Sequence, residues 1–393
     1  MIAPFNRPGG LWYNASMLQP TAHAAPRLTD DGALALYRSA SLHELGRQAH
    51  EACLARHGEP FRTYVVDRNI NYSNLCAAQC AFCAFKAPPG EGWTLPPETI
   101  LRKIQELVDI GGTQVLLQGG LHPELPLQWY EQLLRDVKRA FPRIHMHGFS
   151  PPEIHFFARQ FHLSVPAVLA RLQQAGLDSV PGGGAEILAD RVRKAVSPGK
   201  CLSDEWLEVM RQAHRLGMRT TATMMFGHIE TDAERIEHLR RLRELQDESL
   251  SAGRGGFTAF ISWTFQPDHT PLGQRGEYPP GEGDGEIGRW HEAFDGQSLR
   301  LAGAHEYLRT LALARLYLDN FANLQASWVT QGPKIGQLAL FFGANDLGSV
   351  MMEEKVVSAA GTTYKLTEGQ IRHLITDAGW QPRKRNCYYE LLD

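Results

Sequence analysis

Three cysteines crowd into one short segment of the chain, "NINYSNLCAAQCAFCAFK". Cys76, Cys80 and Cys83 fall within eight residues, although the 393-residue chain has only six cysteines in all. Cysteine thiolates bind zinc or iron–sulfur clusters, and pairs of cysteines form redox disulfides. The crowding therefore indicates metal or redox chemistry in this segment.

An iron–sulfur cluster fits this segment better than zinc or disulfide exchange does. A structural zinc site usually has four ligands in two pairs, and a thioredoxin-like site needs two cysteines. A [4Fe–4S] cluster is normally held by four thiolates, so three would leave one iron free to bind a substrate or a cofactor. Phe82, beside the last cysteine, would shield the cluster from water. A non-catalytic zinc or electron-transfer protein stays open as the alternative. The other cysteines are scattered singly, and we expect them to be buried thiols: Cys53, Cys201 and Cys387.

The composition places the chain among ordinary globular proteins. It is 43% hydrophobic and 21% charged, with a formal net charge of −3 and no block of like charge. Nothing indicates a nucleic-acid surface or a polybasic membrane patch. No apolar run approaches the ~18 residues that a membrane span needs, and Pro and Gly interrupt the N-terminus where a signal peptide would be apolar. We therefore expect a cytoplasmic protein with reduced cysteines and no nucleic-acid or membrane partner.

Segments with a strand pattern alternate with segments of helical periodicity along most of the chain. The predicted strands are 63–73, 113–120, 144–150, 177–186, 218–228, 256–266 and 323–330. The predicted helices are 96–112, 127–141, 165–176, 203–217, 233–248, 305–319 and 333–343. Such repeated alternation favours an α/β fold with a parallel sheet, most simply a (β/α) TIM-type barrel, complete or partial. A doubly wound open sheet is the alternative.

The chain divides into three parts on this interpretation. We expect an N-terminal helical extension at 1–60, the barrel at 61–355, and a C-terminal helix and tail, packed on the outside, at 356–393. The segment Gln266–Gly288 is rich in Pro, Gly and acidic residues, and it is expected to be a surface excursion between two barrel elements.

A barrel predicts that catalytic groups directly follow the strands, at their C-terminal ends. Small or polar residues occupy those positions in this sequence, as a site would require. They are the cysteine segment, Gln118–Gly120, Ser150, Gly184–Glu186, Gly227–His228, Thr264–Gln266, Gln325–Ser327 and Asn345–Asp346.

The pattern Cys76-x3-Cys80-x-Phe82-Cys83, placed after the first predicted strand, resembles the signature of the radical S-adenosylmethionine (radical SAM) superfamily. The resemblance covers most of the chain from Tyr64 to Glu354. The stretches "RNINYSNLC", "GGGAEIL", "TTATMMFGHIET" and "FTAFISWTFQP" resemble the branch that makes menaquinone precursors and deazaflavins. The late block "QASWVTQGPKIGQLALFFGANDLGSVMMEE" most resembles the cyclic dehypoxanthine futalosine synthase family. Aminofutalosine synthases and deazaflavin synthases are the sister alternatives.

The resemblance implies a radical reaction with two cofactors, a [4Fe–4S] cluster and S-adenosyl-L-methionine. The open iron would chelate S-adenosylmethionine, and an external one-electron donor such as flavodoxin or ferredoxin would reduce the cluster. The resulting 5′-deoxyadenosyl radical would take hydrogen from ribose C4′ of dehypoxanthine futalosine. Ring closure of that substrate would serve menaquinone biosynthesis. The expected partner is therefore a small molecule.

The resemblance also implies which residues hold the cluster and the cofactor. Cys76, Cys80 and Cys83 would bind the cluster, and Phe82, Gly119, Gly120, Ser150 and Glu186 would bind the cofactor. In the superfamily an acidic residue usually follows the Gly-Gly pair, whereas here Leu121 and His122 follow it. The pair could instead form a turn, Ser150 could cap a helix, and Glu186 could be an acid at a helix start.

The remaining candidates concern the substrate. His228 and Glu230 are candidates for taking the final proton, although a histidine there could also be a structural hydrogen-bonding group. The substrate carries a ribose and an aromatic carboxylate, which need polar partners inside the barrel. The candidates for that role are Asn71, Gln325, Ser327, Asn345 and Asp346.

Overall fold

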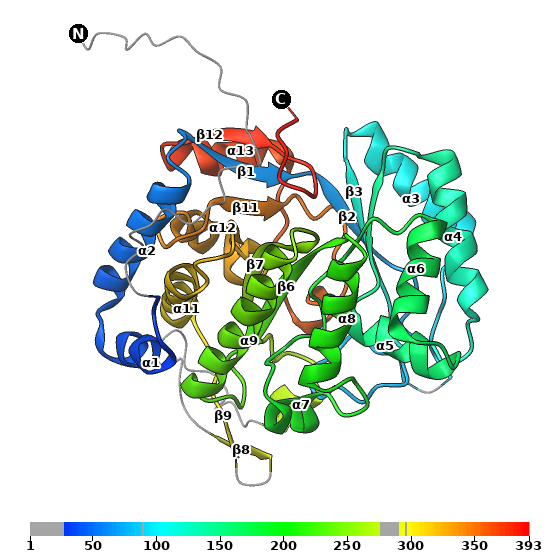
Figure 1. The fold of residues 1–393 in the computed structure, drawn as a ribbon, viewed down its shortest axis with the longest axis horizontal. Helices are drawn as coiled ribbons and strands as arrows, with labels where there is room; N and C mark the ends of the chain where they lie inside the picture. The colour runs from blue at the N-terminus through cyan, green and yellow to red at the C-terminus, as the bar shows by residue number, and fades with distance from the viewer. Residues whose placement is uncertain (1–26, 89, 276–290, 295–296, 393) are drawn as a thin grey trace.

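The computed structural model describes residues 27–88, 90–275, 291–294 and 297–392. Parallel strands form one ten-stranded sheet in the order β12-β1-β11-β10-β7-β6-β5-β4-β3-β2, with helices on its outside (Figure 1). Its strands are β1 (Phe61–Val65), β2 (Asp67–Asn71), β3 (Gln114–Gln118), β4 (His145–Gly148), β5 (Ser179–Val180), β6 (Arg219–Phe226), β7 (Gly256–Thr264), β10 (Asn323–Gln325), β11 (Asp346–Ser349) and β12 (Gln381–Lys384). A separate antiparallel pair joins β8 (His291–Phe294) to β9 (Gln297–Leu299). The predicted surface excursion lies outside the described residues from residue 276 to its end.

The strand order returns on itself, because β1 and β2 are two pieces of one strand. Only Val66 separates them, and the combined strand pairs with β11 along one edge and with β3 along the other. The backbone N–H of Met352 donates to Asp67 on the β11 side, and that of Thr113 donates to Val66 on the β3 side. With β1 and β2 counted as one strand and β12 set aside, eight strands close into a barrel. The predicted TIM-type barrel is confirmed.

Helices cover the outside of this barrel, and each buries one apolar face. In α3, for example, two prolines mark the start, and Ile100, Ile104 and Leu107 lie buried at helical spacing. The helices are α1 (Asp30–Ser39), α2 (Leu42–Arg56), α3 (Pro97–Asp109), α4 (Leu127–Ala140), α5 (Pro151–Gln160), α6 (Val165–Ala175), α7 (Asp190–Val196), α8 (Ser203–Arg215), α9 (Asp232–Ser251), α10 (Pro271–Arg275), α11 (Ala304–Tyr317), α12 (Trp328–Ala339) and α13 (Glu368–Asp377). The N-terminal helices α1 and α2 pack on α9 and α11.

Two parts of the prediction differ from the structure. The strand predicted at 323–330 ends at Gln325, because Trp328 already begins α12, which bends where Gly332 takes a positive φ of 79°. β11 was not predicted, and no ranges were predicted for the short helices α5 and α7. Asp346 therefore begins a strand instead of following one, which places it at the opposite end of the barrel from the expected site.

The C-terminal tail is part of the barrel wall and floor, whereas we expected it to pack only on the outside. β12 pairs with β1 from Phe61 to Tyr64. It lies on the same edge of the combined β1–β2 strand as β3, which pairs with β2. Beyond β12 the chain turns inward, and the Arg385 guanidinium binds the Asp346 carboxylate through two contacts, of 2.5 and 2.9 Å. Both residues are buried, so the tail closes the end of the barrel at which the strands begin, which we call the floor.

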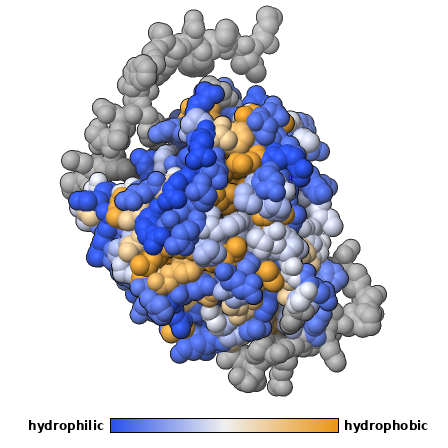
Figure 2. Space-filling view, turned by 90° about the vertical axis from the view of Figure 1, so that its right-hand side faces the viewer, coloured by the Kyte–Doolittle hydropathy of each residue, from blue (hydrophilic) through white to orange (hydrophobic). Residues whose placement is uncertain are grey.

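The surface is mostly polar. Hydrophilic residues surround smaller hydrophobic areas on the face seen in Figure 2. Within the described residues, no helix has the length and apolar character needed to cross a membrane. The division at residues 60 and 355 stays a prediction. The first two helices pack on α9 and α11, and β12 of the tail pairs with β1.

Candidate active site

The three-cysteine loop lies over the ends of the strands, directly after β2. Its backbone is tied to two neighbouring loops of the same barrel mouth. The N–H of Ala77 donates to the carbonyl of Leu121 at 2.8 Å, and the N–H of Ala81 donates to that of Val196 at 2.8 Å. A third bond joins Gln79 to Pro198 at 3.0 Å. The loop is thus held at the end of the barrel where TIM-type enzymes carry out their chemistry.

The cysteines of this loop are free thiols, and they remain the predicted ligands of a metal cluster. Cys80 is buried, whereas Cys76 and Cys83 are half-buried. The Leu121 N–H lies 3.3 Å from the Cys76 sulfur, a contact typical of iron–sulfur ligands. Burial raises the pKa of Cys80 to about 12, so a thiolate there requires nearby positive charge, which iron would supply.

Gly119 and Gly120 follow β3, as predicted, and pack directly against the cysteine loop. A Cβ on Gly119 would lie 2.4 Å from the Tyr72 ring, and a Cβ on Gly120 would lie 2.1 Å from the Leu75 carbonyl oxygen. The Gly120 N–H also donates to Ser73 at 3.1 Å. The absence of side chains at these glycines is therefore what lets the cysteine loop approach the barrel.

A buried carboxylate that the sequence analysis did not select, Glu153, connects this loop to the barrel. It accepts hydrogen bonds from the Tyr72 hydroxyl at 2.7 Å, the Ser150 hydroxyl at 2.7 Å and the Gly119 N–H at 3.2 Å. Burial raises the pKa of Glu153 to about 7, while these hydrogen bonds oppose the rise. Ser150 is the N-cap of α5, so the capping alternative is the one the contacts support. The sequence Ser-Pro-Pro-Glu carries the signal for such a capping box.

Glu186 lies at the cysteine loop and forms a buried ion pair with Lys200, 2.9 Å away. The Lys200 ammonium also lies 5.0 Å from the centre of the Phe82 ring. Burial alone would raise the pKa of Glu186, but Lys200, Arg193 and a backbone hydrogen bond together lower it below its usual value, so the carboxylate is ionised. Glu186 has a positive φ of 42°, a conformation that is uncommon outside glycine and is found at constrained sites. The sequence carried no signal for Lys200, which follows a Ser-Pro-Gly turn.

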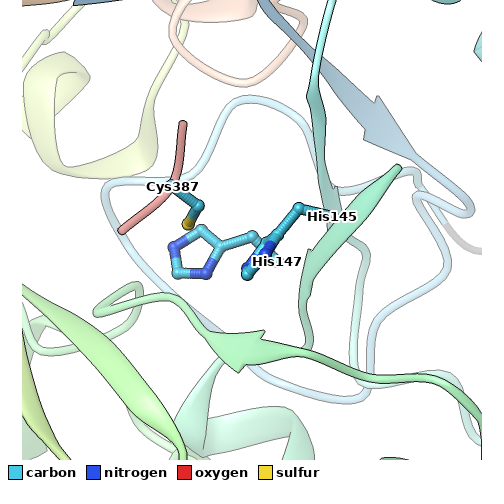
Figure 3. Close-up of side chains that lie close together, drawn as sticks. All are labelled: His145, His147 and Cys387. Carbon is cyan, nitrogen blue, oxygen red and sulfur yellow. The ribbon is translucent and has the colours of Figure 1, made fainter. Parts of the chain in front are cut away.

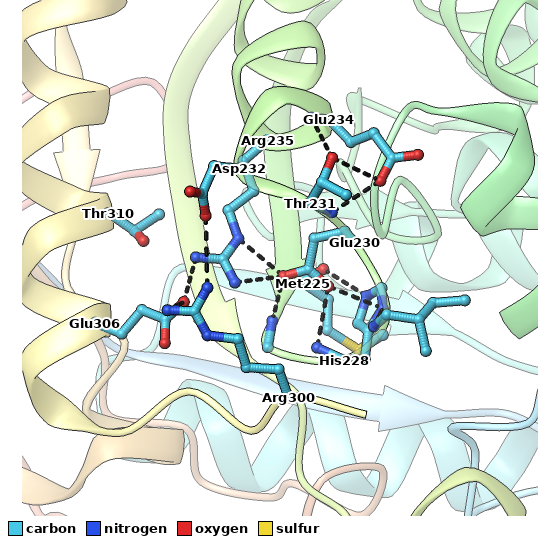
Figure 4. Close-up of polar contacts among 12 residues, drawn as sticks. Met225, His228, Glu230, Thr231, Asp232, Glu234, Arg235, Arg300, Glu306 and Thr310 are labelled. Atoms are coloured by element: carbon cyan, nitrogen blue, oxygen red, sulfur yellow. Dashed lines mark hydrogen bonds and ion pairs between the residues drawn. The ribbon is translucent and has the colours of Figure 1, made fainter. Parts of the chain in front are cut away.

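His228 and Glu230 follow β6 as predicted, but they lie in a closed network of buried polar groups (Figure 4). The two ring nitrogens of His228 lie 3.1 Å from the Met225 carbonyl and 3.0 Å from the Glu230 carboxylate. Glu230 also binds Arg235 at 2.6 Å, and Arg235 binds Glu306 at 2.5 Å. Burial would raise the pKa of Glu230, but His228 and Arg235 lower it to about 2. The proposed role in proton removal stays a prediction, and these contacts favour a structural one.

Of the substrate candidates, Asn71, Gln325 and Ser327 lie at strand ends. Asn71 shares a face of β2 with Asp67 and Asn69, because side chains alternate along a strand. That face points into the barrel, since Asp67 contacts Gln114 of β3 at 2.9 Å. The Oδ1 atoms of Asn69 and Asn71 are buried and have no hydrogen-bond partner in the protein. They are acceptors available to a ligand.

Gln325 is half-buried at the end of β10, and Ser327 caps α12 with its hydroxyl 2.9 Å from that of Thr330. Their assignment to the substrate stays a prediction.

Asn345 and Asp346 lie where β11 begins, and Asp346 pairs with Gln325, the last residue of the short strand β10. Asn345 accepts a hydrogen bond from Arg315 at 2.8 Å, and Asp346 is paired with Arg385. Both side chains are thereby satisfied within the protein. Their assignment to the substrate is untested, but these contacts argue against it. The two residues were selected because strand β11, which begins at Asp346, was not predicted.

Comparison with family profiles divides the chain into two regions. The profile of the radical SAM superfamily matches residues 70–242, and that of the CofH/MqnC C-terminal region matches residues 296–393.

The most similar relatives include two enzymes with the same name. Cyclic dehypoxanthine futalosine synthase of Halalkalibacterium halodurans is 44% identical over 93% of this chain and 92% of that protein. The enzyme of that name from Streptomyces coelicolor is 42% identical over 95% of this chain and 89% of that protein.

Other relatives carry different names. The 5-amino-6-(D-ribitylamino)uracil–L-tyrosine 4-hydroxyphenyl transferase of Methanopyrus kandleri is 39% identical over 88% of this chain and 89% of that protein. Aminodeoxyfutalosine synthase of Thermus thermophilus is 36% identical over 92% of each chain. Among solved structures, methylornithine synthase has a TM-score of 0.63 at 20% identity, covering 91% of this chain and 94% of that one, which shows a shared fold.

Proposed function

Because this chain belongs to the radical SAM superfamily, we propose that it cyclises dehypoxanthine futalosine in the futalosine route to menaquinone. The chain is a radical enzyme whose cofactors are a [4Fe–4S] cluster and S-adenosyl-L-methionine. The observation that carries the proposal is the three-cysteine loop at the barrel mouth, joined to 44% identity over almost the whole chain with an enzyme of that name.

The residues of the barrel mouth fit these cofactors. Cys76, Cys80 and Cys83 would hold the cluster, and the Leu121 N–H would donate to one of its ligands. Glu186, ionised beside Lys200, offers a carboxylate to a hydroxyl or ammonium group of the nucleoside cofactor. When bound, the two cofactors supply one-electron chemistry that removes a hydrogen atom from the substrate. The protein contributes position and a site closed to water.

The inner wall of the barrel supports a substrate rich in hydroxyl groups. The unpartnered Oδ1 atoms of Asn69 and Asn71 lie buried next to the cysteine loop. A buried acceptor without a donor costs about 1–3 kcal/mol. Ribose hydroxyls are donors that would remove this cost, so we propose that these two amides orient the sugar of the substrate.

A sister reaction is the alternative function. The transferase and the aminodeoxyfutalosine synthase named above share much of this sequence, and their names indicate different substrates. The expectation of a flavodoxin or ferredoxin as electron donor is likewise a proposal.

Product analysis would decide between these reactions. Anaerobically reconstituted protein is reduced and incubated with S-adenosylmethionine and dehypoxanthine futalosine, and the products are identified by mass spectrometry. We expect cyclic dehypoxanthine futalosine together with 5′-deoxyadenosine. If the protein converts only the substrates of a sister enzyme and leaves dehypoxanthine futalosine unchanged, the proposed substrate is wrong.

A variant tests the cluster separately from the substrate. Cys80→Ala should retain no cluster and form no deoxyadenosine, because it removes the buried ligand. Cys53→Ala is the matched control, since Cys53 is a buried thiol that lies outside the cysteine loop, 3.7 Å from the Ala344 carbonyl. Deoxyadenosine formation by Cys80→Ala at the wild-type rate would refute the cluster assignment.

A further inference from the structure

A second group of metal-ligating side chains lies in the floor of the barrel. His145 and His147 lie on β4, two residues apart and therefore on the same face, and Cys387 comes from the C-terminal tail. Their ligand atoms all lie within 4.8 Å of one another. The three side chains converge on one space between the strand and the tail (Figure 3). This group lies where the strands begin, so it is separate from the cysteine loop.

One serine hydroxyl lies at the centre of the group. The Ser179 hydroxyl lies 2.6 Å from His145 Nε2, 2.6 Å from His147 Nδ1 and 3.7 Å from the Cys387 sulfur. It donates one hydrogen bond and can accept others from a ring N–H or the thiol, so it links the three residues when no metal is bound. The Thr221 hydroxyl lies 3.4 Å from His147 Nε2. A cation in this space would bind the nitrogen and sulfur lone pairs directly, in place of these hydrogen bonds.

We propose that His145, His147 and Cys387 bind a divalent cation of the zinc type, which fastens the C-terminal tail to the barrel floor. Two imidazoles and one thiolate are the donors that zinc prefers, and a tetrahedral ion would take Ser179 or a water as its fourth ligand. The site joins β4 to the tail after β12, where the described residues 385–392 form one isolated bridge between Arg385 and Leu391 and no helix or strand. The metal is therefore a structural clamp on the floor and takes no part in the radical reaction.

The surroundings of the ligands suit metal binding. His147 and Cys387 are buried and His145 is half-buried, so a bound ion would be enclosed by protein. Tyr388, next to the cysteine, packs edge-on to the His145 ring at 4.8 Å and donates its hydroxyl to the Asp178 carbonyl at 3.2 Å. The Arg385–Asp346 pair holds the tail on the other side of the cysteine. The tail residue that would bind the metal is thus fixed from both sides.

Metal analysis of the intact, cluster-loaded enzyme tests the proposal. Protein with its iron–sulfur cluster in place is incubated with zinc, passed through a desalting column, and analysed for iron and zinc together. We expect one zinc per chain in the wild type, none in Cys387→Ser, and one in Cys53→Ser, the matched buried-thiol control. Full iron content in all three excludes zinc bound to the vacated cysteine loop.

Thermal unfolding provides the second readout, and His145→Gln is the second variant in case the serine variant does not fold. Added zinc should raise the unfolding temperature of the wild type and leave that of either variant unchanged. Equal zinc content in the wild type and both variants, or no zinc in any of them, would overturn the proposal. The three residues would then form only a hydrogen-bonded latch. Neither outcome depends on which substrate the enzyme cyclises.

Discussion

Replacing Gly120 with alanine tests whether the Gly-Gly pair supports the cysteine loop or contacts the cofactor. The added Cβ would lie 2.1 Å from the Leu75 carbonyl oxygen and 2.8 Å from the Cys76 Cβ. Real Cβ contacts essentially never fall below 3.0 Å, so the loop must move by about 0.9 Å. The nearest obstacle is backbone, which cannot swing aside as the end of a flexible side chain could.

The size of this shift sets the expected effect. Inserting a methyl group into a packed region typically costs about 1–3 kcal/mol, which the folded barrel can tolerate. A metal site, by contrast, accepts changes in ligand distance of only about 0.2 Å. We therefore expect Gly120→Ala to fold with a modest loss of stability and to lose most of its cluster.

The assay measures iron and sulfide per chain after anaerobic reconstitution, followed by cleavage of S-adenosylmethionine. Thermal unfolding of the cluster-free protein reports the cost to the fold separately. Gly369→Ala is the matched control, because the nearest atom to its added Cβ, the Thr367 hydroxyl, lies 3.9 Å away. That variant should keep its iron and its activity.

One result would refute this reasoning. If Gly120→Ala keeps a full cluster but needs much more S-adenosylmethionine for half-maximal cleavage, the glycine contacts the cofactor and the loop does not depend on it. Normal iron content together with normal cleavage would show that the loop adjusts to the methyl group, against the geometry described above.

Three further predictions follow from buried charges. Because burial raises the pKa of Glu153 from 4.5 to about 7, the unfolded chain releases a proton that the folded chain keeps. Stability should therefore fall as the pH rises through that range, by up to about 3 kcal/mol in denaturant titrations, and Glu153→Gln should lack this fall. Glu186→Gln removes the charge beside Lys200, so we expect weaker use of S-adenosylmethionine in cleavage kinetics with an unchanged iron content. Arg385→Leu leaves the Asp346 carboxylate buried without its partner, which should lower the free energy of unfolding by about 3–5 kcal/mol in urea. A fall in stability with pH that persists in Glu153→Gln would contradict the first prediction. Unchanged cofactor kinetics in Glu186→Gln would contradict the second, and a loss of stability below about 1 kcal/mol in Arg385→Leu would contradict the third.

The sequence predicted the barrel wall because the wall depends on local patterns. Apolar strands such as Gln114–Gln118 and amphipathic helices such as Pro97–Asp109 carry their own periodicity. β11 carries none, since its residues Asp-Leu-Gly-Ser include types that are rare in strands, and it forms a strand because β1 and β10 bond to it. Missing that strand moved Asn345 and Asp346 in the prediction from the floor of the barrel to its active mouth.

The site, too, was predicted where it depends on local sequence and missed where it depends on distant contacts. The cysteine spacing and the glycine pair are short-range motifs, so the sequence alone located them. The partners Glu153 and Lys200 were not found, because their roles depend on contacts with Tyr72 and Glu186 that only the closed barrel creates. The sequence predicts which residues would hold the cluster, and the structure shows which residues support them.

The same distinction explains why the floor was the least predictable part of the molecule. Its polar contacts join residues far apart in sequence, such as Asp67 with Ser349 and Asp346 with Arg385. Buried Arg385 and Cys387 close the barrel from the end at which its strands begin. The tail thus fills that end, whereas Cys76 and Cys83 are half-buried at the other. A one-electron donor would therefore come closest to a cluster at the end that carries the cysteine loop.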